Sequence, residues 1–140
     1  MDPRIPILEG VYGDGREAER LTRSRSGQLE YLTTLACIDE YAARPCRVLE
    51  LGAGTGAYSL TLAREGYDVT ALELVGRNVE ILRERGRGVP HLTVVRGDAL
   101  DLGRFEDDIR GWQCPFVLVV RNSSCPWRLR VRRSASPPAP

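Results

Sequence analysis

Three glycines, Gly52, Gly54 and Gly56, alternate directly after the apolar run CRVLEL (46–51) and directly before a helical pattern that begins near Ala57. Glycine has no Cβ and adopts positive φ readily, so a loop of this kind lets the backbone approach a bound molecule closely. The free N–H groups of the following helix add partial positive charge beside the loop. The spacing therefore predicts a ligand site at the end of the first strand.

An acidic residue, Glu50, stands two positions before the first glycine. A carboxylate there would repel the pyrophosphate of a dinucleotide and would favour a cationic or amine-bearing ligand. This charge argues for S-adenosylmethionine rather than a dinucleotide as the bound molecule.

Two further acids lie at the ends of the next two predicted strands. Glu73 lies near the end of DVTALEL (68–74), 23 residues after Glu50, and this spacing is close to the roughly 20 residues that separate a glycine loop from a ribose-binding acid in a βαβ unit. Asp98 ends LTVVRGD (92–98). Three acids at three successive strand ends are far more specific than a glycine motif alone.

This arrangement, acid-x-Gly-x-Gly-x-Gly after one strand and an acid after each of the next two, resembles the class I S-adenosylmethionine-dependent methyltransferases. The resemblance covers residues 20–108 and is closest to small uncharacterised members, whose approach to the glycine loop looks like LTRSRSGQLEYLTTLACIDEY here. It implies an α/β fold, namely the Rossmann-like parallel sheet that forms the N-terminal half of such an enzyme. S-adenosyl-L-methionine would lie across the carboxyl ends of the first three strands.

The resemblance also implies a role for each site residue. The glycines would give room for the methionine moiety and the sugar, and Glu50 would fix the loop and support the amino end. Glu73 would accept hydrogen bonds from both ribose hydroxyls, and Asp98 would accept one from the adenine amine. The implied cofactor-binding set is Glu50, Gly52, Ala53, Gly54, Gly56, Glu73, Leu74, Asp98 and Ala99.

Two other interpretations remain open at this point. The first is a nicotinamide-dependent oxidoreductase, because GAGTGA (52–57) also fits G-x-G-x-x-A and Glu73 would suit the ribose of NAD. Glu50 and Asp98 argue against it. The second is a truncated domain that has no catalytic activity.

The surrounding pattern alternates strand and helix. Helical spacing of Tyr31, Leu35, Ile38 and Ala42 predicts a helix that Pro45 ends, because the residue before a proline disfavours the α region. Such alternation predicts parallel, right-handed βαβ units. The expected strands are 46–51, 68–74, 92–98 and 115–120 (PFVLVV), and the expected helices are 57–65, capped by Gly66, and 77–85, ended by Gly86.

Composition changes sharply after Asp108. Residues 1–108 contain 14 arginines and all 19 acids, whereas residues 109–140 contain six arginines and no acid. We expect an N-terminal segment (1–26), a partial cofactor-binding domain (27–121) and a disordered tail rich in arginine, serine and proline (122–140). A frame change or truncation near residue 109, a natural divergent tail and a basic binding arm are three accounts of that tail.

The acceptor and the catalytic residues are not predicted. In the family that the chain resembles, the groups that select the methyl acceptor come from the later strands, so we expect little methyl transfer from this chain alone. A small-molecule acceptor is favoured over nucleic acid, because the arginines from Arg16 to Arg25 alternate with acids, as in a solvated, ion-paired segment. His91 would lie at the opposite end of the sheet from the site.

The expected location is the cytoplasm. The start, MDPRIPILEG, has no long apolar run of the kind found in a signal peptide or a membrane span. Cys37, Cys46, Cys114 and Cys125 form no C-x-x-C pair, and the chain has one histidine. We therefore expect free thiols and no metal site.

Overall fold

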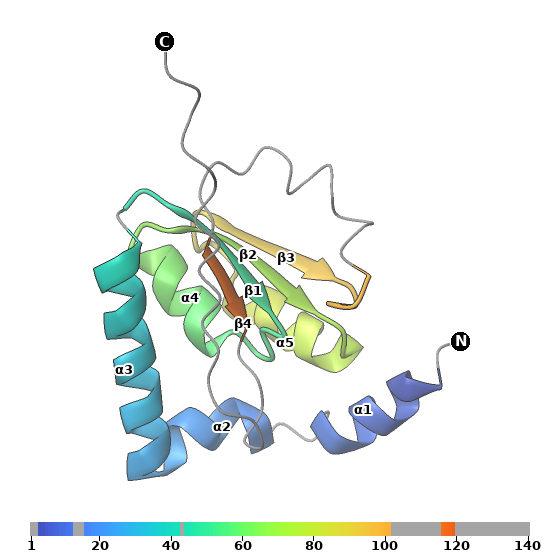
Figure 1. The fold of residues 1–140 in the computed structure, drawn as a ribbon. Helices are drawn as coiled ribbons and strands as arrows, with labels where there is room; N and C mark the ends of the chain where they lie inside the picture. The colour runs from blue at the N-terminus through green and yellow to red at the C-terminus, as the bar shows by residue number, and fades with distance from the viewer. Residues whose placement is uncertain (1–2, 13–15, 43, 102–115, 120–140) are drawn as a thin grey trace.

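A four-stranded parallel sheet forms the centre of the computed structural model, which describes residues 3–12, 16–42, 44–101 and 116–119 (Figure 1). The strand order is β3-β2-β1-β4, and every neighbouring pair is parallel. This sheet confirms the predicted Rossmann-like α/β fold, including a strand within residues 115–120. The strands are β1 (Arg47–Leu51), β2 (Asp68–Glu73), β3 (Leu92–Arg96) and β4 (Phe116–Val119).

Helices α4 (Ala57–Arg64) and α5 (Gly76–Arg85) cover one face of this sheet (Figure 1). Alternate residues of a strand point to opposite faces, and Val48 and Ala71 point to the face that these helices cover. Val48 packs in a cluster with Tyr58 of α4, and Ala71 packs in one with Leu82 of α5. This core fixes the positions of the loops that leave the carboxyl ends of β1 and β2.

Helix α3 (Arg25–Tyr41) precedes β1 and ends earlier than its sequence predicts. Ala42 leaves the helix with φ −120° and ψ 98°, while its N–H still donates to the carbonyl of Ile38 at 2.8 Å. The helix thus ends at Tyr41, four residues before Pro45, and Ala42 is buried in the core. The structure confirms the two helix ends that were predicted at glycines, at Gly66 after α4 and at Gly86 after α5.

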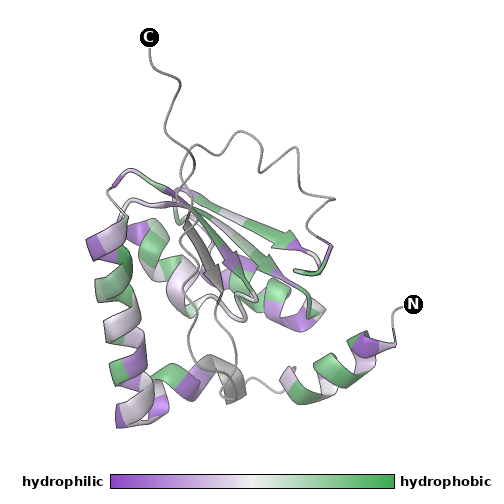
Figure 2. Ribbon diagram, viewed as in Figure 1, coloured by the Kyte–Doolittle hydropathy of each residue, from purple (hydrophilic) through white to green (hydrophobic). Residues whose placement is uncertain are grey.

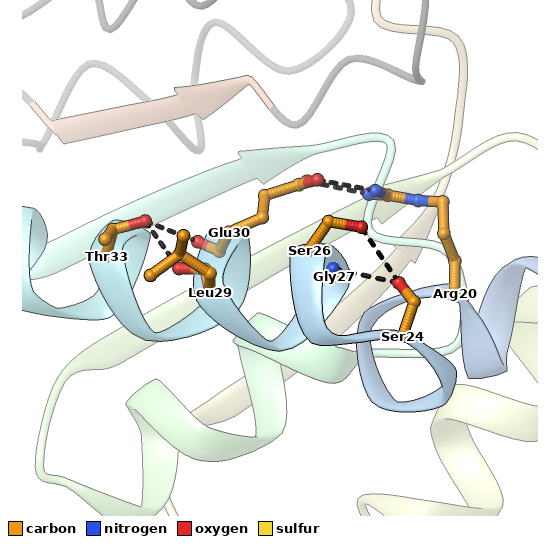
Figure 3. A network of polar contacts seen from close by, with 7 residues as sticks. All are labelled: Arg20, Ser24, Ser26, Gly27, Leu29, Glu30 and Thr33. Atoms are coloured by element: carbon orange, nitrogen blue, oxygen red, sulfur yellow. Dashed lines mark hydrogen bonds and ion pairs between the residues drawn. The ribbon is translucent and has the colours of Figure 1, made fainter.

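Two helices occupy the N-terminal segment, where the sequence pattern indicated none: α1 (Arg4–Tyr12) and α2 (Arg16–Arg23). A polar network joins α2 to the start of α3 (Figure 3). The guanidinium of Arg20 donates to both carboxylate oxygens of Glu30, at 2.8 and 2.9 Å, and the hydroxyl of Ser24 accepts a hydrogen bond from the N–H of Gly27 at 3.0 Å. Arg20 and Arg23 of this segment thus take part in ion pairs, as the alternating charges predicted.

Apolar residues occur both in the central sheet and in helix α1 (Figure 2). Apolar residues dominate the centre of the sheet, whereas α1 carries apolar residues such as Ile7 and Val11 that are exposed. Within the described ranges, no helix is both long and apolar enough to cross a membrane. The expected tail, 122–140, lies outside the described residues.

Candidate functional site

The loop after β1 has the backbone conformation that its glycines predict. Gly52, Gly54 and Gly56 all have positive φ, at 73°, 57° and 91°. The N–H groups of Gly52 and Ala53 both donate to the carbonyl of Leu72 in β2, at 2.9 and 3.1 Å. The loop is therefore held against the end of the neighbouring strand.

The glycines of this loop face different surroundings. A Cβ on Gly54 would have no atom within 4 Å, so the backbone borders open space there. A Cβ on Gly56 would overlap the Leu82 side chain and approach Leu60 Cγ at 3.3 Å. The geometry suits Gly54 to leave room for a ligand, whereas Gly56 permits close packing of the helices.

Glu73, at the end of β2, reaches back to the glycine loop. Its Oε2 accepts a hydrogen bond from the N–H of Gly54 at 2.7 Å, and its Oε1 accepts one from the N–H of Val75 at 2.8 Å. Only 6% of the residue is exposed. Each carboxylate oxygen can accept a second hydrogen bond, so Glu73 keeps acceptor capacity for the hydroxyls of a ligand.

Glu50 is turned toward α4 rather than along the loop. Its carboxylate accepts a hydrogen bond from the hydroxyl of Ser59, and the residue is 1% exposed. Burial raises the pKa of Glu50 to about 7, the hydrogen bonds from Ser59 oppose the rise, and the negative charge of Glu73 adds to it. A cation placed near this carboxyl group would favour its ionised form. Ser59 is a contact that the sequence pattern did not predict.

Asp98 lies beyond β3 and not at its last position, which corrects the predicted strand 92–98. The strand ends at Arg96, and the N–H of Gly97 donates to the carbonyl of Glu73 at 3.0 Å. Asp98 Oδ1 accepts a hydrogen bond from the N–H of Leu100 at 2.9 Å, which turns the chain away from the sheet. The turn keeps Asp98 near the carboxyl end of β2.

An arginine from the N-terminal helix also reaches Asp98. Arg4 Nη2 donates to Asp98 Oδ2 at 2.6 Å, across 94 positions of sequence. No signal in the sequence pairs these two residues. Asp98 therefore has both of its oxygens engaged by this chain.

The other predicted or excluded residues lie as follows. Leu74 is half-buried beside Glu73, and Ala99 is exposed beside Asp98. His91 is exposed at the start of β3, at the opposite end of the sheet from the glycine loop, as predicted. Tyr31 bonds through its hydroxyl to Thr61 at 2.5 Å and packs against the core.

Comparison with protein families identifies this arrangement. A family model described as a methyltransferase domain matches residues 48–123, which is more than half of the chain. The chain belongs to this methyltransferase family. The match confirms the predicted class, the S-adenosylmethionine-dependent methyltransferases, and the cofactor of that class is S-adenosylmethionine. It also extends past the change in composition after Asp108.

Among individual relatives, this methyltransferase domain is similar to the ribosomal RNA small subunit methyltransferase A of Geobacter sulfurreducens. The two are 37% identical over an alignment of 95 residues that covers 64% of this chain and 33% of that protein. The domain thus spans about a third of the length of this curated relative.

Solved structures show the same similarity. One, described as "Conversion of a Disulfide Bond into a Thioacetal Group during Echinomycin Biosynthesis", is 28% identical with a TM-score of 0.51, over 62% of this chain and 35% of that chain. A glycopeptide N-methyltransferase, MtfA, complexed with S-adenosyl-L-methionine, is 30% identical with a TM-score of 0.41, over 49% of this chain and 31% of that chain.

The residues of the methyltransferase domain fit this cofactor. Open space beside Gly54 gives room for a ligand at the loop, and the spare acceptor capacity of Glu73 matches two ribose hydroxyls. Glu50 is buried against α4, where its carboxylate accepts the hydrogen bond from Ser59. Asp98, like Glu73, already accepts one hydrogen bond at each oxygen, but one of its donors is the charged guanidinium of Arg4.

Proposed function

We propose that this domain binds S-adenosylmethionine across the carboxyl ends of β1, β2 and β3 and forms the cofactor-binding half of a methyltransferase. The observation that carries the proposal is the position of Glu73, whose carboxylate joins the end of β2 to the open side of the glycine loop through Gly54. A ribose bound there would meet an acceptor that is already oriented, so little ordering would be needed on binding.

When bound, the cofactor supplies a methyl group on a positively charged sulfur, and that group passes to a nucleophile aligned behind it. The contribution of this chain is to hold and orient the donor. Gly54 leaves room at the loop, Glu73 binds the ribose, and Asp98 with Ala99 binds the adenine. Alignment of this kind can supply several kcal/mol of the barrier to transfer, at roughly 7 kcal/mol or more when it is complete.

A small-molecule acceptor is our first proposal. Residues 1–108 have more acidic than basic side chains, which would weaken the attraction of this part of the chain for a phosphate backbone. The similarity to the structure from echinomycin biosynthesis also supports it.

Ribosomal RNA is the second candidate acceptor. The support for it is the 37% identity with the ribosomal RNA methyltransferase of Geobacter sulfurreducens. The two candidates can be separated by supplying methyl-labelled cofactor with a cell extract and counting the label in its RNA and small-molecule fractions. Label in RNA alone would contradict the first proposal, and label in small molecules alone would contradict the second.

Cofactor binding itself has a direct test. We expect isothermal titration to detect binding of S-adenosylmethionine or its demethylated product, S-adenosylhomocysteine, and to detect much weaker binding of NADH, because the acids oppose a pyrophosphate. Tighter binding of NADH than of either would refute the proposal and support the oxidoreductase interpretation.

We also propose a cytoplasmic location. The support is the exposed thiol of Cys37, which is free within the part of the chain that the structure describes and suits a reducing compartment. Fractionation of the source cells followed by immunodetection would test it, and recovery with secreted proteins would contradict it.

A further inference from the structure

Arg4 of α1 forms an ion pair with Asp98, the acid that is proposed to bind the adenine of the cofactor. Its guanidinium donates to Asp98 Oδ2 at 2.6 Å, while the N–H of Leu100 holds Oδ1 at 2.9 Å. In this arrangement the oxygen of Asp98 that is not used by its own turn faces a cation. An adenine amine that donates to the same oxygen would have to lie beside the positively charged guanidinium of Arg4.

Helix α1 buries little surface against the other described elements. None of its residues is buried, and the apolar side chains of Ile7 and Val11 are exposed (Figures 1 and 2). Among the described elements, α1 has no extensive contact with any other helix or strand. The ion pair with Asp98 links this helix to the end of the sheet.

The exposure of the pair indicates that it can be broken. The Arg4 side chain is 47% exposed and that of Asp98 is 22% exposed. Partly exposed ion pairs of this kind stabilise a protein only slightly, because water solvates both partners when they separate. A ligand that binds with ordinary affinity can therefore displace Arg4.

We propose that Arg4 competes with the cofactor for Asp98, so that binding at the adenine end of the site releases α1 from the sheet. This inference rests on the proposed function, because it takes the ligand at Asp98 to be S-adenosylmethionine. It assigns to α1 a role that the cofactor motif does not include, namely to hold the adenine end closed when no cofactor is bound.

The test is titration of S-adenosylhomocysteine into the full chain and its variants. Removing the competitor in Arg4→Ala should tighten binding by about threefold to fivefold, the range expected for one weak ion pair. The matched control is Arg87→Ala, which removes a more exposed arginine (78% against 47% for Arg4) paired with Glu84 at 2.5 Å, in the turn after α5. This control should bind like the wild type.

Hydrogen exchange on the wild-type protein gives a second measurement that needs no variant. Amides of residues 4–12 should exchange faster when S-adenosylhomocysteine is added, because α1 is released. Unchanged or weaker binding by Arg4→Ala, or slower exchange of residues 4–12, would overturn this inference and leave the proposed function intact. Absence of binding by the wild type would overturn both.

Discussion

The two ends of the candidate site are built in different ways. At the glycine loop, Glu73 is buried and accepts hydrogen bonds from two backbone amides, and Glu50 is enclosed between β1 and α4. At the end of β3, Asp98 lies in a turn and pairs with an exposed arginine of a helix that has no buried residue.

This difference separates a fixed part of the site from an exchangeable one. Buried acceptors held by backbone donors are costly to disturb. Removing one partner leaves the other buried without a hydrogen bond, which lowers the free energy of unfolding. An exposed ion pair can exchange its partner at small cost. We expect the loop end to govern both stability and affinity, and the Asp98 end to adjust affinity with only a small effect on stability.

The largest expected effect is on the loop end, in Gly56→Ala. A Cβ would overlap Leu82, and a non-glycine residue at φ 91° is strained, so we expect a loss of about 3 kcal/mol of unfolding free energy. The matched variant Gly54→Ala, at φ 57° with open space around the Cβ, should lose only about 1 kcal/mol. Urea unfolding of both would show it, and equal losses would refute the division of roles between these glycines.

Glu50 should make stability depend on pH. Its pKa is about 7 when folded and 4.5 as a free side chain, so the folded protein holds this proton more strongly. The contribution of Glu50 to the free energy of unfolding should therefore be largest below pH 4.5 and should fall as the pH rises from 4.5 to 7. The total loss should be about 3 kcal/mol, with no further change above pH 7.

The variant Glu50→Gln isolates the contribution of Glu50 to the pH dependence of stability. It keeps a hydrogen-bond acceptor for Ser59 and cannot ionise, so it should gain stability relative to the wild type as the pH rises from 5 to 8. Chemical unfolding of both proteins across this range is the measurement. A difference that stays constant with pH would show that Glu50 does not titrate in the folded state.

The next effect concerns affinity. Glu73→Ala should weaken the binding of S-adenosylhomocysteine by about 1.5 to 3 kcal/mol, the range for losing hydrogen bonds to a charged group. Glu84→Ala, which removes an exposed acid of α5, is the control and should bind within twofold of the wild type. An unchanged affinity in Glu73→Ala would remove Glu73 from the site.

The smallest effect on stability is expected at the other end of the site. Asp98→Ala removes the exposed pair with Arg4 and one hydrogen bond from Leu100, so it should cost about 1 kcal/mol of unfolding free energy. The same denaturant titration would check it. A loss as large as that of Gly56→Ala would show that the Asp98 end is as rigid as the loop, and the comparison would fail.

Much of the fold between residues 46 and 96 could be predicted from the sequence. Its strands are short runs rich in apolar residues, and Gly66 and Gly86 mark the helix ends, so local pattern and backbone geometry agree. Helix α1 gives no such signal, because it contains Pro6 and Gly10 and buries no face against the core.

Part of the candidate site could likewise be predicted from the sequence, and part could not. The positive φ values of the glycines and the place of Glu73 follow from motif spacing. The pair of Arg4 with Asp98 does not, because 94 residues separate them and only the tertiary fold brings them together. The orientation of Glu50 toward Ser59 likewise depends on how α4 packs.

The place of β4 in the sheet has a consequence for the order in which the chain folds. Partners in β1 and β2, such as Arg47 and Asp68, are 21 positions apart, whereas Val48 and Phe116, partners in β1 and β4, are 68 positions apart. Closing the longer loop costs more chain entropy before any contact is gained. We therefore expect β1, β2 and β3 to form a folding nucleus, with β4 joining late, so that the cofactor-binding strands assemble before their last neighbour arrives.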